Sequence, residues 1–145
     1  MRCATRSVPR AVLDPNVLVS AFISPAGASA RLLVELRAGA FELVTSPQLL
    51  GELRDVLRRP KFRRYVTAPE VSAFVELLRR ESIVVDDPIP SASPIGSDPG
   101  DESLIALARS ARVDAIVSGD THLLGLRPAI PALTPREFLD SLQDR

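Results

Sequence analysis

Two aspartates in this 145-residue sequence follow short apolar runs. Asp14 comes directly after residues 11–13 (AVL), and Asp120 ends the segment 114–120 (DAIVSGD). In an open parallel sheet, ligands gather beyond the carboxyl ends of the strands. If both runs are strands of such a sheet, the two carboxylates are expected to point into one crevice, where they could bind a cation.

Two further acids lie in segments with the apolar spacing of amphipathic helices. Asp101 precedes Leu104 by three residues and Ile105 by four, so it continues the inward face of its helix into the first turn. Glu52 follows Leu49 by three residues and lies at the edge of an apolar stripe, so it is expected to lean toward the sheet. Both acids are therefore candidates for the same crevice.

Each of the four acids alone has a structural explanation, as a turn former, a helix-dipole partner, a cap or a solvated flank. Together they lack basic partners nearby in the sequence, and a divalent cation would relieve their mutual repulsion. Mg²⁺ or Mn²⁺ prefers oxygen ligands and keeps waters that can be activated for attack on a phosphodiester. A zinc site is disfavoured, because His122 and Cys3 are the only histidine and cysteine.

The remaining patterns alternate between strands and helices. The apolar runs 11–13 and 17–23, which Asp-Pro-Asn separates, predict a buried first strand that ends at Asp14. Further strands are expected at 41–45, 83–86 and 114–120, and a loop is expected at 87–97. One helix is expected at about 29–38 and another from Ser46-Pro47 to Arg59. Three more are expected to begin at Thr67, at Asp98-Pro99 and at Thr134. This alternation predicts an α/β fold, a three-layer α/β/α sandwich with a central parallel sheet.

Length and composition predict one globular domain over residues 1–145, with its core at about 10–140. A hydrophobic fraction of 46% beside 25% charged residues excludes a disordered chain, and the net charge of zero neither indicates nor excludes a nucleic-acid partner. No apolar run approaches the roughly 18 residues of a membrane span. The first ten residues lack the apolar core of a signal peptide, and Cys3 is the single cysteine, so a cytoplasmic location is expected.

The sequence resembles the PIN-domain family, and within it the small bacterial toxins of type II toxin-antitoxin systems (VapC-like). The resemblance covers about residues 10–140 and rests on four blocks: VLDPNVLVSA around Asp14, SPQLLGELRDVL around Glu52, SDPGDESLIALA around Asp101, and DAIVSGDTHLL around Asp120. One block alone would be unspecific, but their joint order and spacing are typical of the family.

The resemblance implies a PIN-like fold and a Mg²⁺- or Mn²⁺-dependent endoribonuclease. Its four acids, Asp14, Glu52, Asp101 and Asp120, would hold one or two metal ions and position the attacking water. In-line attack on phosphorus would leave 5′-phosphate and 3′-hydroxyl ends. The implied partners are an RNA substrate and a small antitoxin protein, and homodimerisation is left open.

Polar residues flank two of these acids. By the same resemblance, Asn16 and Ser118 match positions that would orient the aspartates. Pro15 stands where the family commonly has Thr or Ser, and His122 is interpreted as a bystander on a loop. The other nearby acids are interpreted as a cap, a solvated first-turn residue and a strand-entry residue, in the order Asp98, Glu102 and Asp114.

Basic residues cluster between positions 54 and 64, and four of them, Arg54, Arg58, Arg59 and Lys61, are candidates for contact with RNA phosphates. A solvated helix end, favoured by the helix dipole, explains the same residues equally well.

Two other functions stay in consideration. A catalytically weak PIN-fold module for RNA binding or as an adaptor would keep the fold without the cleavage. An aspartyl-phosphate phosphatase with Asp14 as nucleophile is disfavoured, because it needs an acid at position 16, which is Asn, and a well-placed lysine.

Overall fold

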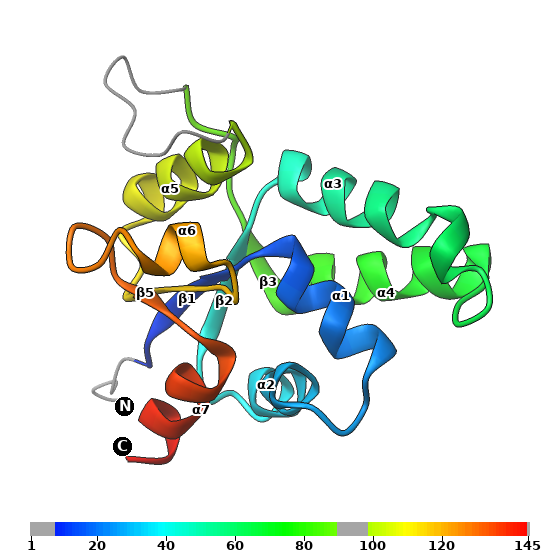
Figure 1. The fold of residues 1–145 in the computed structure, drawn as a ribbon, viewed down its shortest axis with the longest axis horizontal. Coiled ribbons are helices and arrows are strands. Elements are labelled where there is room, and N and C mark those ends of the chain that lie inside the picture. The colour runs from blue at the N-terminus through cyan, green and yellow to red at the C-terminus, as the bar shows by residue number, and fades with distance from the viewer. Residues whose placement is uncertain (1–7, 90–98, 145) are drawn as a thin grey trace.

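The computed structural model describes residues 8–89 and 99–144, and within them five short strands form one parallel sheet (Figure 1). The strand order is β3-β2-β1-β4-β5, and all four pairings are parallel. The strands are β1 Arg10–Leu13, β2 Glu42–Thr45, β3 Ser82–Val84, β4 Ala115–Val117 and β5 Ala132–Leu133. The predicted α/β class with a parallel sheet is confirmed.

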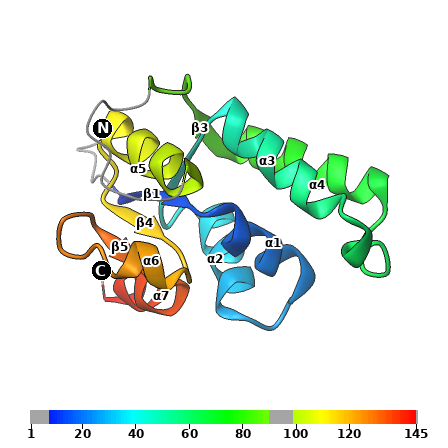
Figure 2. The same ribbon diagram turned by 45° about the horizontal axis from the view of Figure 1, so that its top comes forward.

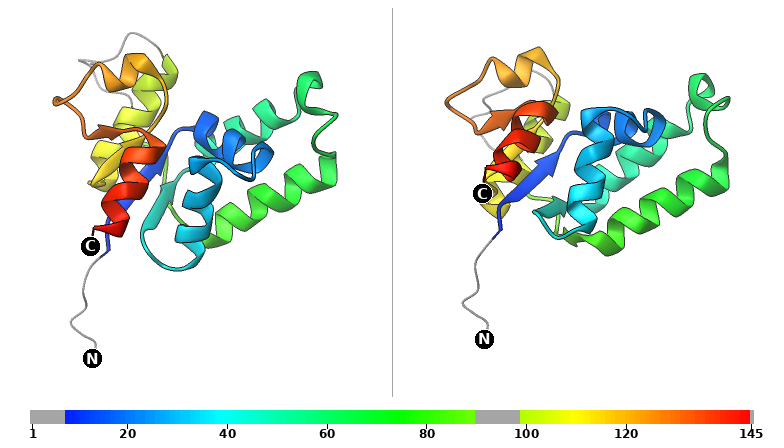
Figure 3. Two further views of the ribbon diagram at one scale, coloured as in Figure 1. Left: turned by 60° about the horizontal axis from the view of Figure 1, so that its bottom comes forward. Right: turned by 90° about the horizontal axis from the view of Figure 1, so that it is seen from below.

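Helices cover both faces of the sheet. They are α1 Pro15–Ile23, α2 Ala28–Arg37, α3 Pro47–Leu57, α4 Ala68–Glu81, α5 Pro99–Ala111, α6 Thr121–Leu124 and α7 Pro135–Gln143, and a 3₁₀ turn lies at Pro60–Phe62. Helices α2 and α7 contact each other on one face, and α5 packs on β1 and β4 on the other (Figures 2 and 3). This arrangement is the predicted three-layer sandwich.

Local sequence signals explain where several helices begin. Ser46 accepts a hydrogen bond from the backbone N–H of Leu49, as an N-cap should, and Pro47 occupies the first helical position of α3. Complete capping boxes open α4 and α7, at Thr67 and Thr134. The predicted start of α5 at Asp98 lies outside the described residues.

The first strand ends just before Asp14, as expected, but the apolar run 17–23, for which no helix was predicted, belongs to α1. Asp14 caps this helix, α1, and Pro15 supplies a φ already suited to its first turn. Three consecutive residues of this helix, Val17, Leu18 and Val19, are buried and apolar. The run therefore lacks the apolar spacing of an amphipathic helix, and its β-branched composition resembles that of a buried strand. The four-residue α6 and the two-residue β5 were also not predicted.

The register of the central strands positions the residues that follow them. Leu13 of β1 pairs with Val117 of β4, and the backbone N–H of Asp14 donates to the carbonyl oxygen of Val117 at 2.9 Å. The next residues along both strands, Asp14 and Ser118, therefore lie side by side at the carboxyl edge of the sheet.

No single helix among the described residues has both the length and the apolar composition of a membrane span. The pair α1 and α2 meets that test only jointly, with a bend of 95° between them.

Candidate active site

Asp14 is held at both carboxylate oxygens. Its Oδ1 accepts the backbone N–H of Asn16 at 3.0 Å, and its Oδ2 accepts the hydroxyl of Ser118 at 2.8 Å. The residue is buried and serves as the N-cap of α1. This capping also explains Pro15, which occupies the first helical position, where no backbone N–H is required.

Asp120 repeats this arrangement after β4. It caps α6, its Oδ1 accepts the backbone N–H of His122 at 2.8 Å, and its own backbone N–H donates to the hydroxyl of Ser118 at 3.0 Å. The imidazole of His122 is exposed. Both acids thus combine a structural capping role with a place at the carboxyl ends of adjacent parallel strands.

The buried hydroxyl of Ser118 links the two acids, because it donates to the Asp14 carboxylate and accepts from the Asp120 backbone. Asn16, in contrast, holds Asp14 through its backbone N–H, while its side chain is exposed. Each of the two residues predicted to flank the acids therefore hydrogen-bonds Asp14.

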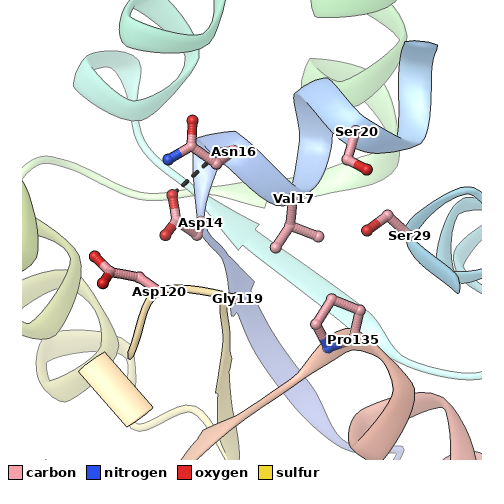
Figure 4. A pocket seen from close by; sticks show the side chains of 8 residues that line it. All are labelled: Asp14, Asn16, Val17, Ser20, Ser29, Gly119, Asp120 and Pro135. Atoms are coloured by element: carbon pink, nitrogen blue, oxygen red, sulfur yellow. Dashed lines mark hydrogen bonds between the residues drawn. The ribbon is translucent and has the colours of Figure 1, made fainter. Parts of the chain in front are cut away.

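Asp14 and Asp120 line one hollow of about 490 Å³ at the edge of the sheet (Figure 4). The other residues that line it are Asn16, Val17, Ser20, Ser29, Gly119 and Pro135. In the close view the two carboxylates lie near one end of this hollow, and Ser20 and Ser29 lie at the other.

The other two predicted acids do not line this hollow. Asp101 is buried in the first turn of α5, whereas Glu52, which was expected to lean toward the sheet, is exposed on α3. Within residues 8–89 and 99–144, no three Asp, Glu, His or Cys side chains are grouped closely enough to hold a metal ion. The structure thus brings together two of the four predicted acids, and the metal-binding role of all four stays a prediction.

The donor chemistry of the acid pair suits a hard divalent cation. Oδ2 of Asp120 accepts no hydrogen bond from the described residues, and each oxygen of Asp14 keeps a lone pair beyond the one hydrogen bond that it accepts. Mg²⁺ and Mn²⁺ prefer such carboxylate oxygens and retain several waters. The pair fits these ions as a partial ligand set.

Glu102 is an acid whose environment was predicted wrongly. It was expected to be a solvated first-turn residue, but it is half-buried, and its Oε2 is buried without a hydrogen-bond partner among the described residues. A buried carboxylate oxygen without a partner is costly, so this atom would gain from a cation or water. Its position beside Asp101 is the one sequence signal that could have indicated it.

Asp114 has the structural role expected of it. Its Oδ2 accepts the backbone N–H of Arg10 at 2.9 Å, which joins the entries of β4 and β1. It therefore lies at the opposite ends of these strands from the hollow.

The predicted RNA-contact residues lie at the end of α3 that is remote from the sheet (Figure 1). We call residues 58–65 (RRPKFRRY) the basic tip. All five of its cationic side chains are exposed, while Arg54, one turn earlier, is half-buried. In the described part of the chain none of these six side chains forms an ion pair. The Nζ of Lys61 lies 5.1 Å from the ring centroid of Phe62, and Tyr65 is 57% exposed.

Comparisons with known proteins agree with this architecture. A family model described as PIN domain matches residues 10–122. An uncharacterised protein of Methanocaldococcus jannaschii, MJ1680, is 25% identical over an alignment of 146 positions that covers 92% of each chain.

Two solved structures share the fold. The structure of PAE2754 from Pyrobaculum aerophilum has a TM-score of 0.65 at 14% identity, over 95% of this chain and 91% of that chain. A chain of VapBC2 from Rickettsia felis, solved bound to a DNA fragment from their promoter, has a TM-score of 0.58 at 15% identity, over 86% of this chain and 98% of that chain.

Proposed function

This chain belongs to the PIN-domain family, whose members are generally nucleases, and from that premise we propose that it is a Mg²⁺- or Mn²⁺-dependent endoribonuclease. One observation supports the proposal above all. Asp14 and Asp120 follow adjacent parallel strands, share the hydroxyl of Ser118 and line the same hollow.

In this proposal Asp14 and Asp120 hold the cation, with Asp101 and Glu52 completing the ligand set. The bound cation would supply an activated water and neutralise charge that develops on the phosphate. Ser118 and the backbone N–H of Asn16 fix the Asp14 carboxylate, so its orientation does not have to be established when substrate binds. Exposed cations of the basic tip would contact RNA phosphates away from the site of cleavage.

The experiment is cleavage of labelled single-stranded RNA by the purified protein. With Mg²⁺ or Mn²⁺ the wild type should cut, leaving 5′-phosphate and 3′-hydroxyl ends. Four variants should not cut while their far-ultraviolet circular dichroism stays that of the wild type: Asp14→Asn, Glu52→Gln, Asp101→Asn and Asp120→Asn. The matched control is Asp140→Asn, which changes an exposed acid of α7 and should leave cleavage intact. Cleavage by all four variants at the wild-type rate would refute the assignment.

We further propose that the protein is the toxin of a toxin-antitoxin pair, neutralised by a small antitoxin protein. The four sequence blocks and the fold shared with a chain of VapBC2 support this assignment. Expression should arrest bacterial growth, and expression of Asp14→Asn should not. If wild type and variant permit equal growth and neither cleaves RNA, the protein is instead an RNA-binding or adaptor module.

A further inference from the structure

At the end of the hollow opposite the acid pair lies a serine that is almost fully buried and whose hydroxyl faces the hollow. Ser29, in the first turn of α2, is only 8% exposed, and its hydroxyl makes no hydrogen bond with a described residue. Its oxygen points into the hollow, and the hydroxyl of Ser20 on α1 points toward the same space (Figure 4). A polar side chain that is more than nine-tenths buried and faces the hollow without a partner among the described residues is available to a ligand bound there.

The beginning of α2 supplies backbone donors beside this hydroxyl. The first N–H groups of a helix have no partner within it, and the N-cap of α2 is Gly27, which has no side chain to accept them. Within the described residues, the backbone N–H groups of Ala28, Ser29 and Ala30 have no acceptor outside the helix. Free N–H groups and the positive end of the helix dipole favour an anion.

We propose that this end of the hollow binds a phosphate group, held by the hydroxyl of Ser29 and the first turn of α2. The hollow, at about 490 Å³, falls within the size range of ligand sites, roughly 300 to 1,000 Å³. This inference rests on the proposed function, because it takes the phosphate to be a phosphodiester of the RNA chain next to the one at the acid pair. One end of the hollow would then bind the cation and the other end a phosphate, and together they would orient the RNA chain across the site.

The test is a nuclear magnetic resonance titration of the Asp14→Asn protein in EDTA, where cleavage is switched off and Asn still serves as an N-cap. Two ligands are added separately, inorganic phosphate and a short single-stranded RNA. The amide signals of residues 28–30 should shift with both, and with RNA at the lower concentration. When the Asp14→Asn protein also carries Ser29→Ala, it loses a hydrogen bond to the charged phosphate group. The ligand concentration at half-maximal shift should then rise about tenfold for both ligands.

Three controls make the titration specific. Ser72→Ala removes an exposed hydroxyl from α4 and should leave the midpoints unchanged, and the first-turn amides of α4, which Thr67 caps, should not shift. Ser29→Asp places a carboxylate where the phosphate would bind and should abolish the shifts. The amide spectrum itself shows whether each variant is folded.

Unmoved signals for residues 28–30 with both ligands would overturn the proposal, and so would shifts that Ser29→Ala does not weaken. Shifts with inorganic phosphate but not with RNA would show a free-phosphate site and overturn the substrate assignment. Binding is measured here without metal and without cleavage. A failure of the phosphate-site proposal can therefore be distinguished from a failure of the proposed ribonuclease activity, which is measured on the wild type with metal.

Discussion

Asp14 both caps α1 and belongs to the proposed ligand set, and two substitutions separate these roles. Asn caps a helix as well as Asp does, whereas Ala cannot, so in EDTA Asp14→Asn should be more stable to unfolding than Asp14→Ala by about 1 kcal/mol. Both variants should lose RNA cleavage. Urea unfolding with an activity assay on the same samples checks this, and a cleaving Asp14→Asn protein would remove Asp14 from the site.

Ser118 has a measurable role because its buried hydroxyl serves both acids. Ser118→Ala leaves the backbone N–H of Asp120 without its acceptor, so the free energy of unfolding should fall by about 1 to 3 kcal/mol. Cleavage should weaken as well, because Asp14 loses one of its two orienting bonds. Ser110→Ala, at an exposed position of α5, is the control. Equal stability of Ser118→Ala and wild type would contradict this role.

At the scale of residues, the sequence allows prediction of the polar site residues that come directly after a strand. Asp14, Ser118 and Asp120 were identified in this way or by family resemblance, because a buried run followed by a polar residue is visible in the sequence. The buried oxygen of Glu102 and the unpartnered hydroxyl of Ser29 were not, because both depend on packing between segments distant in the chain.

Among the elements, the basic tip is the predicted surface for RNA phosphates. Replacing Arg58 and Arg59 together with Ala should weaken RNA binding for all sequences alike and reduce the salt slope by up to about 0.7 per lost contact. The matched control replaces Arg79 and Arg80, an exposed adjacent pair on α4. An unchanged slope would show that the tip is an ordinary solvated helix end.

The tip also carries its own optical reporter. Tyr65 is the only tyrosine and the chain has no tryptophan, so the intrinsic tyrosine emission comes from the tip alone. If RNA binds there, addition of single-stranded RNA to the Asp14→Asn protein should change this emission, since bases stack readily on exposed aromatic rings. Constant emission at saturating RNA would place the bound strand elsewhere.

Helix α7, whose Pro135 lines the hollow, has a predictable pH dependence. The backbone N–H of Thr134 donates to the Glu137 carboxylate and, with help from the Arg127 guanidinium, lowers the Glu137 pKa from its usual 4.5. The contribution of the Glu137 carboxylate to the stability of the folded protein is therefore complete above about pH 4.5, and it is lost as pH falls through the folded-state pKa of Glu137. Thermal melts should show Glu137→Gln less stable than wild type near neutral pH, with the gap closing in acid. A gap that widens in acid would contradict this.

At the scale of elements, strong local signals allowed prediction and short or fully buried segments did not. The capping boxes at Thr67 and Thr134 correctly indicated α4 and α7. Helix α1 was missed because its buried run has no period, and α6 and β5 are too short to show one. The strand order was not predicted, because it is set by packing rather than by any one segment.

For the whole molecule, the hollow that Asp14 and Asp120 share links stability to metal. Without metal their carboxylates repel, so Asp120→Asn, which keeps the cap of α6, should melt higher than wild type in EDTA. Mg²⁺ should raise the wild-type midpoint more than that of the variant, since a ligand at a hundred times its Kd adds about 2.7 kcal/mol. A variant that melts lower than wild type in EDTA would show that the charge of Asp120 is stabilising.

The fold class itself was predictable, because alternating strand and helix patterns admit few architectures besides a layered parallel sheet. Of the four acids that were expected to converge at one point, the structure brings two together among the described residues. Two of them, Asp14 and Asp120, follow paired strands, whereas Glu52 and Asp101 depend on where α3 and α5 pack.

The central claim is that the acid pair serves metal-dependent RNA cleavage, and single-turnover cleavage of labelled single-stranded RNA tests it most directly. Wild type and Asp14→Asn are first treated with excess EDTA and then supplied with Mg²⁺ or Mn²⁺. Neither protein should cut in EDTA, and added metal should restore cleavage to the wild type alone. Full cleavage by wild type in EDTA, or equal cleavage by both proteins with metal, would contradict the claim.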